Sequence, residues 1–208
     1  IARRVAMLTD YQNAAYAERY RALVERVRGK EAQIAAGSTA LTEAVARYAY
    51  KLMAYKDEYE VARLYTSGHF LKQIEAQFEG DYRLHVNLAP PLLAKRDDDG
   101  HLAKSEYGPW MLKAFGLIKH LRFLRGTALD PFGRSEERRT ERALIEEYVQ
   151  TIEQLLSHLN PERIDLATQI AAVPEHIRGY GHVKEAHLAK AKAEREALLA
   201  QWQGKRMG

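Results

Sequence analysis

The chain has 208 residues, no cysteine, and 32 basic against 28 acidic residues, which leaves a net charge of only +4. Without cysteine, this chain can form no disulfide, no thiolate nucleophile, no cysteine-ligated zinc site and no iron–sulfur cluster of its own. No apolar run approaches the roughly 20 residues that span a bilayer, and the N-terminal residues lack the apolar centre of a signal peptide, so we expect a cytoplasmic protein with no membrane partner.

Helical periodicity dominates the first eighty residues. Apolar residues recur every three or four positions over residues 1–28, and Gly29 then offers a break. A second helical pattern covers residues 41–59, and the two helices are long enough to lie antiparallel as a hairpin. A short third helix is predicted over residues 70–78, closed by Gly80 at its C-terminus.

After Gly80 the apolar period changes from helical to twofold. Alternation from Tyr82 to Leu88 is typical of a half-buried strand. Pro90 and Pro91 end this strand, and Asp99-Gly100 is a turn signal before a returning segment. The pattern predicts a small β-hairpin or three-stranded excursion around residues 82–107.

The second half of the chain again predicts helices. Pro109 suits the first turn of a helix that runs to Leu124, and Ser135 is a candidate N-cap for a helix over 135–159. Asn160 before Pro161 marks a third start, and that helix should end before Pro174, with Val173 pushed away from helical geometry. A last, highly charged helix covers residues 183–203.

These elements predict a mainly α, multi-helix fold with one small β excursion. We interpret residues 1–208 as a single helical domain. Because the helical pattern begins at Ile1 without an initiator methionine, we also interpret the chain as a segment of a larger polypeptide.

Residues 174–196 concentrate three histidines, but their spacing does not favour a metal site. His182 and His187 are five residues apart, about 140° around a helix of 3.6 residues per turn, so one helical face cannot hold both. The chain contains neither a His-Glu-x-x-His nor a Glu-x-x-His pattern. The aspartates at 97–99 lack the spaced ligands of a calcium loop, and we interpret them as a solvated turn. We predict no metal ligand and no catalytic residue.

The same segment carries a candidate anion site, formed by Arg178, Gly179, Gly181, His182 and Lys184. The two glycines come just before a helix, whose N-terminal amides and positive potential favour a phosphate or carboxylate. The competing interpretation is a hinge, in which the glycines only let one helix turn into the next. Both interpretations stay open, with the hinge favoured.

The tyrosines Tyr48, Tyr50, Tyr55, Tyr59 and Tyr65 crowd the second helical pattern. They could form a stacking surface for bases or an aromatic ligand. We favour packing in a core or against another domain, where each phenol finds one polar partner.

Nucleic acid is the least favoured partner. A binding surface would use the basic last helix, with Lys184, Lys190, Lys192, Arg195 and Lys205, and its affinity would fall steeply with salt. Recognition needs a concentrated basic face, whereas here the charges of both signs are interspersed.

Five blocks of the sequence carry a resemblance to a known family. They are ARRVAMLTDYQNAAYAERYRALVERV, KLMAYKDEYEVARLY, QFEGDYRLHVNLAPPLLAK, YGPWMLKAFGLIKHLRFLRGTALDPFGRSEERR and IRGYGHVKEAHLA. Together, and in this order, they resemble the C-terminal region of the long-chain indolepyruvate ferredoxin oxidoreductases. The resemblance runs almost from end to end and omits the final QGKRMG.

The resemblance implies a parent enzyme that decarboxylates a 2-oxoacid such as indolepyruvate on thiamine diphosphate with magnesium. The acyl group passes to coenzyme A, and iron–sulfur clusters deliver the electrons to ferredoxin. The family's cluster cysteines and thiamine motif have no counterpart in this chain, so no catalytic residue can be transferred to it.

We therefore expect an inactive structural or accessory module within a parent enzyme that forms a homo-oligomer. The module would pack on the catalytic domains of the same polypeptide, order their subunit contacts or cover an active-site entrance. The sharper alternative is a ligand-binding module whose Arg178–Lys184 segment contacts a phosphate of coenzyme A.

Overall fold

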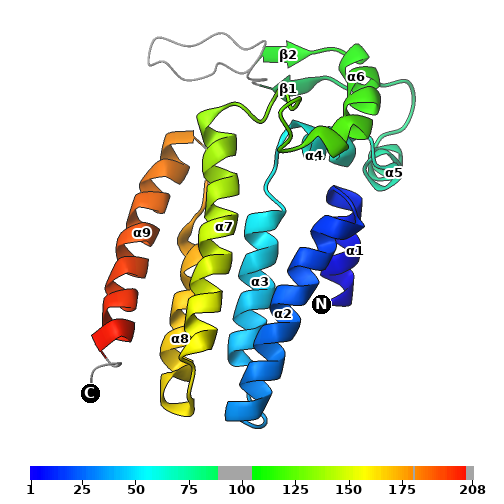
Figure 1. Ribbon diagram of the computed structural model, residues 1–208. Helices are drawn as coiled ribbons and strands as arrows, with labels where there is room; N and C mark the ends of the chain where they lie inside the picture. The colour runs from blue at the N-terminus through cyan, green and yellow to red at the C-terminus, as the bar shows by residue number, and fades with distance from the viewer. Residues whose placement is uncertain (89–104, 180, 205–208) are drawn as a thin grey trace. The chain divides into compact units, whose positions relative to one another are not determined.

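The computed structural model describes residues 1–88, 105–179 and 181–204 (Figure 1). Its helices are α1 (Ala2–Tyr11), α2 (Ala14–Ile34), α3 (Ala40–Met53), α4 (Glu58–Tyr65), α5 (Gly68–Gln77), α6 (Trp110–Ile118), α7 (Glu136–Ser157), α8 (Ile164–Ala172) and α9 (Gly181–Gly204), with 3₁₀ turns at Lys119–Leu124, Pro161–Arg163 and Val173–His176. The two strands β1 (Val86–Leu88) and β2 (Ser105–Tyr107) form one antiparallel sheet. The prediction of a mainly α fold with a small β excursion is confirmed.

The elements divide into two compact units. Unit 1 joins Ile1–Tyr55 to the residues from Thr140 onward, and unit 2 is the continuous stretch Lys56–Arg139. The predicted β excursion is therefore the centre of a larger inserted unit that also contains α4, α5 and α6. That all 208 residues act as one domain stays a prediction.

Unit 1 is a helical bundle. Helices α2 and α3 form the predicted antiparallel hairpin, α3 also packs on α8, and α8 packs on α9 (Figure 1). Helix α7 adds an apolar stripe of Leu144, Ile145, Tyr148, Ile152 and Leu155, all buried. The three-and-four spacing of this stripe is why α7 can lie against the other helices along most of its length.

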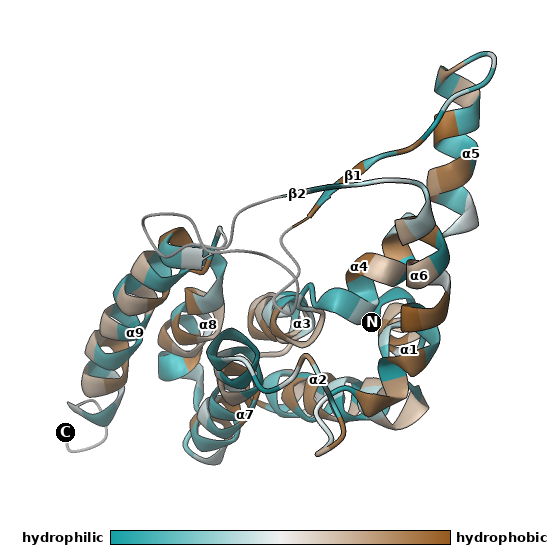
Figure 2. Cartoon of the chain, turned by 90° about the horizontal axis from the view of Figure 1, so that it is seen from above, coloured by the Kyte–Doolittle hydropathy of each residue, from teal (hydrophilic) through white to brown (hydrophobic). Residues whose placement is uncertain are grey.

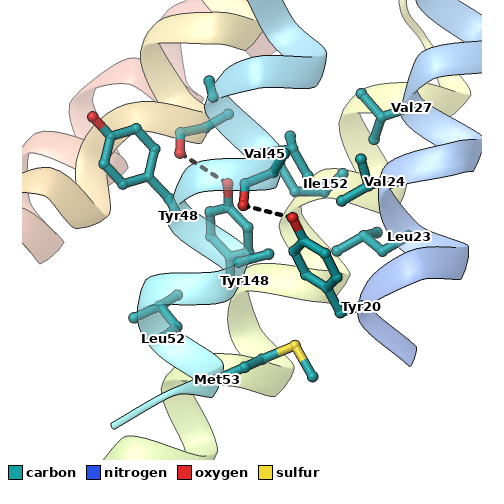
Figure 3. Close-up of a cluster of buried hydrophobic side chains, with 14 of the residues drawn as sticks. Tyr20, Leu23, Val24, Val27, Val45, Tyr48, Leu52, Met53, Tyr148 and Ile152 are labelled. Atoms are coloured by element: carbon teal, nitrogen blue, oxygen red, sulfur yellow. Dashed lines mark hydrogen bonds between the residues drawn. The ribbon is translucent and has the colours of Figure 1, made fainter. Parts of the chain in front are cut away.

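Tyrosine hydroxyls link the helices of unit 1 to one another. Tyr11, Tyr16 and Tyr20 donate hydrogen bonds to the backbone oxygens of Tyr55, Met53 and Ala46, at 2.9, 2.9 and 3.0 Å. In Figure 3, Tyr20 points from α2 toward α3 and Tyr148 donates across to a carbonyl oxygen of α8, that of Ala171, at 2.9 Å. These phenols place a ring in the core and still satisfy their polar end.

The five tyrosines singled out in the sequence are all buried or half-buried. Tyr48, Tyr55 and Tyr59 are buried, and Tyr65 stacks on Phe115 with ring centroids 5.7 Å apart. These positions correspond to the packing interpretation.

Replacing Tyr20 by phenylalanine should lower the free energy of unfolding by about 1 kcal/mol, because a net intramolecular hydrogen bond is lost while the ring stays in place. Urea unfolding measures the difference. Tyr82→Phe is the matched control, since Tyr82 is exposed and should change stability by less than about 0.5 kcal/mol. Equal effects of the two substitutions would contradict a stabilising role for the Tyr20 hydroxyl.

The first predicted helix is interrupted at a different residue from the one expected. The chain breaks at Asn13, whose side chain accepts a 2.8 Å hydrogen bond from the Tyr16 amide and caps α2. Gly29, the predicted break, lies inside α2, which continues to Ile34. Asn is among the best N-cap residues, whereas a single glycine costs a helix only about 1 kcal/mol, so the cap decides the boundary.

The second predicted helix, over residues 41–59, also divides. Helix α3 ends at Met53, and Asp57 begins α4 by accepting a hydrogen bond from the Glu60 amide at 2.9 Å. Asp57 is therefore a cap and not an interior helical residue.

The other predicted element boundaries agree with the structure only in part. The predicted strand shrinks to Val86–Leu88, where Val86 pairs with Tyr107, and the helix expected to reach Leu124 becomes 3₁₀ after Ile118. Pro90, Pro91 and the Asp99-Gly100 turn lie outside the described residues.

Predicted caps also had mixed outcomes. Ser135 does cap α7, accepting a hydrogen bond from the Arg138 amide at 3.3 Å. Asn160 makes no side-chain cap, and a 3₁₀ turn precedes α8. Helix α8 ends before Pro174 as predicted, but Val173 keeps helical angles (φ −47°, ψ −39°) because Pro174 is tolerated in the first turn of the 3₁₀ segment that follows.

Unit 2 has a small core of its own. Ala62, Val86, Met111 and Phe115 are buried together, from α4, β1 and α6. Helix α5 contributes no buried residue. Among the described residues of both units, no helix is long and apolar enough to cross a membrane.

Candidate functional site

The predicted hinge and anion segment lies where the last 3₁₀ turn meets α9. Gly179 and Gly181 have φ values of +92° and +53°, a region that favours glycine. His187 lies one turn and a half into α9, and its Nδ1 is 2.8 Å from the carbonyl oxygen of Arg178. Since a carbonyl only accepts, Nδ1 of His187 carries the proton, and the bond ties the helix back onto the turn.

Both cations of the candidate anion site are paired with carboxylates of this chain. Nη2 of Arg178 is 3.2 Å from Oε1 of Glu175, and Nζ of Lys184 forms an ion pair with Glu141 on α7. His182 is exposed in the first turn of α9. An anion would therefore have to compete with Glu175 and Glu141, and the anion site stays a prediction.

The structure adds Lys51 of α3 to this region, which the sequence did not indicate. Its Nζ donates to the carbonyl oxygens of Pro174 and Glu175 at 2.7 and 3.0 Å. Burial lowers the pKa of Lys51, and the positive charges of Arg178 and Lys184 lower it further. Because Lys51 lies more than a hundred residues from its partners, no local spacing could have predicted the contact.

Gly179→Ala should destabilise the chain by about 1–2 kcal/mol, because alanine is strained at this φ. Its Cβ would also lie 2.8 Å from Cγ1 of Val183. Gly29→Ala should instead stabilise by about 0.5–1 kcal/mol, since it lies inside α2. A Cβ at position 29 meets nothing within 4 Å. Thermal unfolding of the two variants should shift in opposite directions, and a shared direction would refute the hinge geometry.

The basic residues of α9 that were considered for nucleic acid binding differ in their surroundings. Lys184 and Arg195 are paired with Glu141 and Glu147 of α7, and Glu185, Glu194 and Glu196 lie among the remaining cations. Lys190 and Lys192 are exposed, while Lys205 lies outside the described residues. Charges of both signs along the helix are typical of a solvated surface.

A buried polar network in unit 2 is the main feature that sequence reasoning missed. Arg125 forms a two-pronged ion pair with Asp57, at 2.5 Å from Nε to Oδ2 and 2.9 Å from Nη2 to Oδ1. Both side chains are 3% exposed. Asp57 at the same time caps α4. Such a planar, charge-assisted pair is among the strongest hydrogen-bonded arrangements in proteins.

Asp130 forms the second half of this network. Its carboxylate accepts hydrogen bonds from the Tyr59 hydroxyl at 3.0 Å, the Gly126 amide at 2.8 Å and the Phe132 amide at 3.1 Å. Burial raises the pKa of Tyr59, and the hydrogen bond to Asp130 raises it further.

Together the two carboxylates fix the segment of residues 124–133 onto α4. Arg125 lies 68 residues from Asp57 and Tyr59 lies 71 residues from Asp130. Since an isolated Asp or Arg gives no periodic signal, no sequence pattern indicated these distant contacts. The described hydrogen bonds of Asp57 and Asp130 go to other residues of unit 2. The network therefore holds the loop of residues 124–133 in place.

Unit 2 also carries most of the exposed large apolar side chains. Among the described residues, nine of the twelve belong to unit 2, although it is the smaller unit. The most exposed are Leu117, Phe123 and Leu129, at 73, 62 and 76%. Figure 2 shows hydrophobic stretches on both α5 and α6. An excess of exposed apolar side chains in one unit points to an interaction site there.

A small pocket in unit 1 is one place among the described residues where a ligand could be sought. Within the described ranges no group of three or more His, Cys, Asp or Glu side chains could hold a metal ion. A pocket in unit 1, with Tyr148, Ile177, Leu188 and Arg195 in its lining, has a volume of about 30 Å³. Cofactor sites usually measure roughly 300–1,000 Å³, so this pocket is too small for coenzyme A.

The fold and its exposed surface define a mainly α-helical protein with an inserted, apolar-surfaced unit. The chain belongs to DUF6537, a family of unknown function whose sequence pattern matches residues 1–197. No curated protein and no solved structure was found to match it.

Proposed function

We propose that this chain is the C-terminal accessory module of a 2-oxoacid ferredoxin oxidoreductase of the long-chain indolepyruvate type. Two observations support the proposal. Five sequence blocks resemble that family in order along the chain, and the exposed apolar side chains concentrate on unit 2. The second observation is the main support for an accessory role, because exposed apolar surface is suited to packing on other protein domains.

In this proposal the chemistry belongs to other domains of a cytoplasmic, homo-oligomeric parent. The parent would oxidatively decarboxylate indolepyruvate or a similar 2-oxoacid to an acyl-coenzyme A and pass the electrons to ferredoxin. Thiamine diphosphate with magnesium and iron–sulfur clusters would supply that chemistry there. The residues of this chain do not fit a cluster, because it has no cysteine, and we assign no reaction step to them.

The experiment is an assay of the intact parent polypeptide beside this chain alone. With indolepyruvate and coenzyme A, the intact polypeptide should reduce methyl viologen, a one-electron acceptor that replaces ferredoxin, whereas residues 1–208 should not. Cluster cysteines and a thiamine motif should lie upstream of Ile1 in the parent reading frame. Turnover by this chain alone, or an inactive parent without those motifs, would exclude the proposal.

A second candidate function is binding of a coenzyme A phosphate at Arg178–Lys184. The convergence of Lys51 with Arg178 and Lys184 favours it, while their carboxylate partners oppose it. Arg178→Ala and Lys184→Ala in the intact enzyme should then raise the KM for coenzyme A. An unchanged KM would exclude this role, and Lys190→Ala on the exposed face of α9 serves as the charge-matched control.

A further inference from the structure

The stretch of residues 110–129 in unit 2 combines exposed apolar side chains with charged residues of one sign. We define the docking surface as Trp110, Leu117, Leu121, Phe123 and Leu129, all exposed. Trp110 and Leu117 are seven residues apart on α6, two helical turns, so their side chains share one face. The opposite side of α6 buries Met111 and Phe115 in the core of unit 2.

The loop half of this surface is held in place by the buried network. Arg125 and Asp130 are buried, with only 5% and 3% of their surface exposed. Phe123 and Leu129, next to them in sequence, are exposed. The ion pair with Asp57 and the hydrogen bonds of Asp130 thus fix the backbone that presents the two apolar side chains. A surface whose backbone is already ordered loses less conformational entropy on association.

The charged residues within this stretch are all basic. From Trp110 to Leu129 the sequence contains Lys113, Lys119, Arg122 and Arg125 and no acidic residue. Asp57 neutralises Arg125. Lys113, Lys119 and Arg122 form no ion pair with any described residue, so they leave positive charge beside the apolar groups. A complementary surface would present apolar recesses bordered by carboxylates.

We infer that the docking surface binds an acidic, apolar protein surface on the other domains of the parent polypeptide. The inference rests on the proposed function for the identity of the parent. A second copy of this chain fits less well, because a twofold contact would place the same cations against one another. An anionic membrane also fits less well, since lipid does not require apolar side chains held in fixed positions, whereas a protein interface does.

The test is carbodiimide cross-linking of the intact parent polypeptide, which joins lysine amines to carboxylates in contact. Lys113 and Lys119 should form cross-links to Asp or Glu residues outside positions 1–208. Lys190 and Lys192 on α9 are the matched lysines and should form far fewer. Leu117→Asp combined with Leu129→Asp should reduce the cross-links from Lys113 and Lys119 roughly tenfold, because like charge and lost apolar contact both oppose docking.

A control and a second measurement separate loss of docking from loss of folding. Leu71→Asp changes an exposed apolar residue of the same unit, on α5, and should leave the cross-links unchanged. Hydrogen exchange of residues 117–129 should be roughly tenfold slower in the intact polypeptide than in this chain alone. Equal exchange in the two would overturn the inference even if a variant failed to fold.

Other results would overturn the inference in specific ways. Cross-links confined to Lys190 and Lys192 would move the contact to α9, and cross-links between two copies would indicate a self-interface. Sedimentation of the chain with phosphatidylcholine–phosphatidylserine vesicles, but not with phosphatidylcholine alone, would indicate a membrane surface. Cross-links as expected in a parent that does not oxidise indolepyruvate would refute the proposed enzyme and leave the docking surface intact.

Discussion

Arg125→Met should destabilise unit 2 by about 3–5 kcal/mol, because it leaves the carboxylate of Asp57 buried without its cation. The side chain of Asp57 is only 3% exposed, so water cannot replace the guanidinium without opening the structure. The aliphatic chain of methionine fills much of the same volume, so the loss measures the charge more than the packing. Urea unfolding followed at unit 2 checks the prediction.

Two further variants test the cause of that effect. Asp57→Asn combined with Arg125→Met should recover part of the lost stability, since the isolated charge is gone while Asn still caps α4. Arg21→Ala removes a solvent-exposed ion pair with Glu18 and should have little effect. An Arg125→Met variant as stable as the unsubstituted chain would contradict the argument. A double variant less stable than the single Arg125→Met variant would also contradict it.

The two tryptophans allow the two units to be followed separately. Trp110 lies in unit 2 and Trp202 is buried in unit 1. In a Trp202→Phe background, the fluorescence of the remaining Trp110 therefore follows the unfolding of unit 2. In a Trp110→Phe background, the fluorescence of Trp202 follows the unfolding of unit 1. The Arg125 substitution should move the first transition more than the second.

Glu31→Gln should destabilise unit 1 by about 2–3 kcal/mol at pH 7, because a buried carboxylate that accepts several hydrogen bonds is replaced by an amide. Glu31, 1% exposed on α2, accepts from the Ser38 hydroxyl and from the amides of Leu41 and Thr42, at 2.8, 3.1 and 2.8 Å. It caps the N-terminus of α3, where Thr39 makes no side-chain cap. A negative charge at this end of a helix is also favoured by the helix dipole.

The pH dependence of this contribution has a definite sign. Burial raises the pKa of Glu31, but the hydrogen bonds from Thr42, Ser38 and Leu41 outweigh it, so the pKa is lower in the folded chain than the ordinary 4.5. The unfolded chain then binds the proton more readily, and the stabilisation is complete above about pH 4.5 and lost as pH falls through the lowered value. The difference in the free energy of unfolding between the unsubstituted chain and Glu31→Gln should become smaller on acidification.

Urea unfolding at neutral pH and below pH 4 measures this change. Glu185→Gln on the exposed surface of α9 is the matched control and should alter stability by less than about 0.5 kcal/mol at either pH. A Glu31→Gln effect that stays constant with pH would refute the role of the charge.

Local patterns predicted the fold class well and the connections between elements poorly. The stripe of α7, its Ser135 cap and the extent of α9 follow from spacing and cap chemistry that act within one or two turns. The break at Asn13 was missed because apolar periodicity continues across it while the cap acts through a single side chain. Periodicity reports which face is buried, and only weakly where a helix ends.

The candidate site also combines local features that the sequence predicts with distant contacts that it does not predict. The glycine turn at 179–181 could be predicted because φ values of that sign favour glycine. The neutralisation of Lys184 by Glu141, 43 residues away, and of Arg125 by Asp57, 68 residues away, could not. Ion pairs between distant segments leave no periodic trace in one sequence, and they decide whether a cation is available to a ligand.

The interruption of unit 1 by unit 2 also constrains how the chain can fold during synthesis. The ion pair of Arg26 with Glu153 and the hydrogen bond of Tyr48 to Glu175 each join residues 127 positions apart. The ribosome must therefore release all of unit 2 before the α1–α3 helices can meet α7 and α8. Unit 2 is continuous in sequence, so it can close before the two halves of the bundle meet.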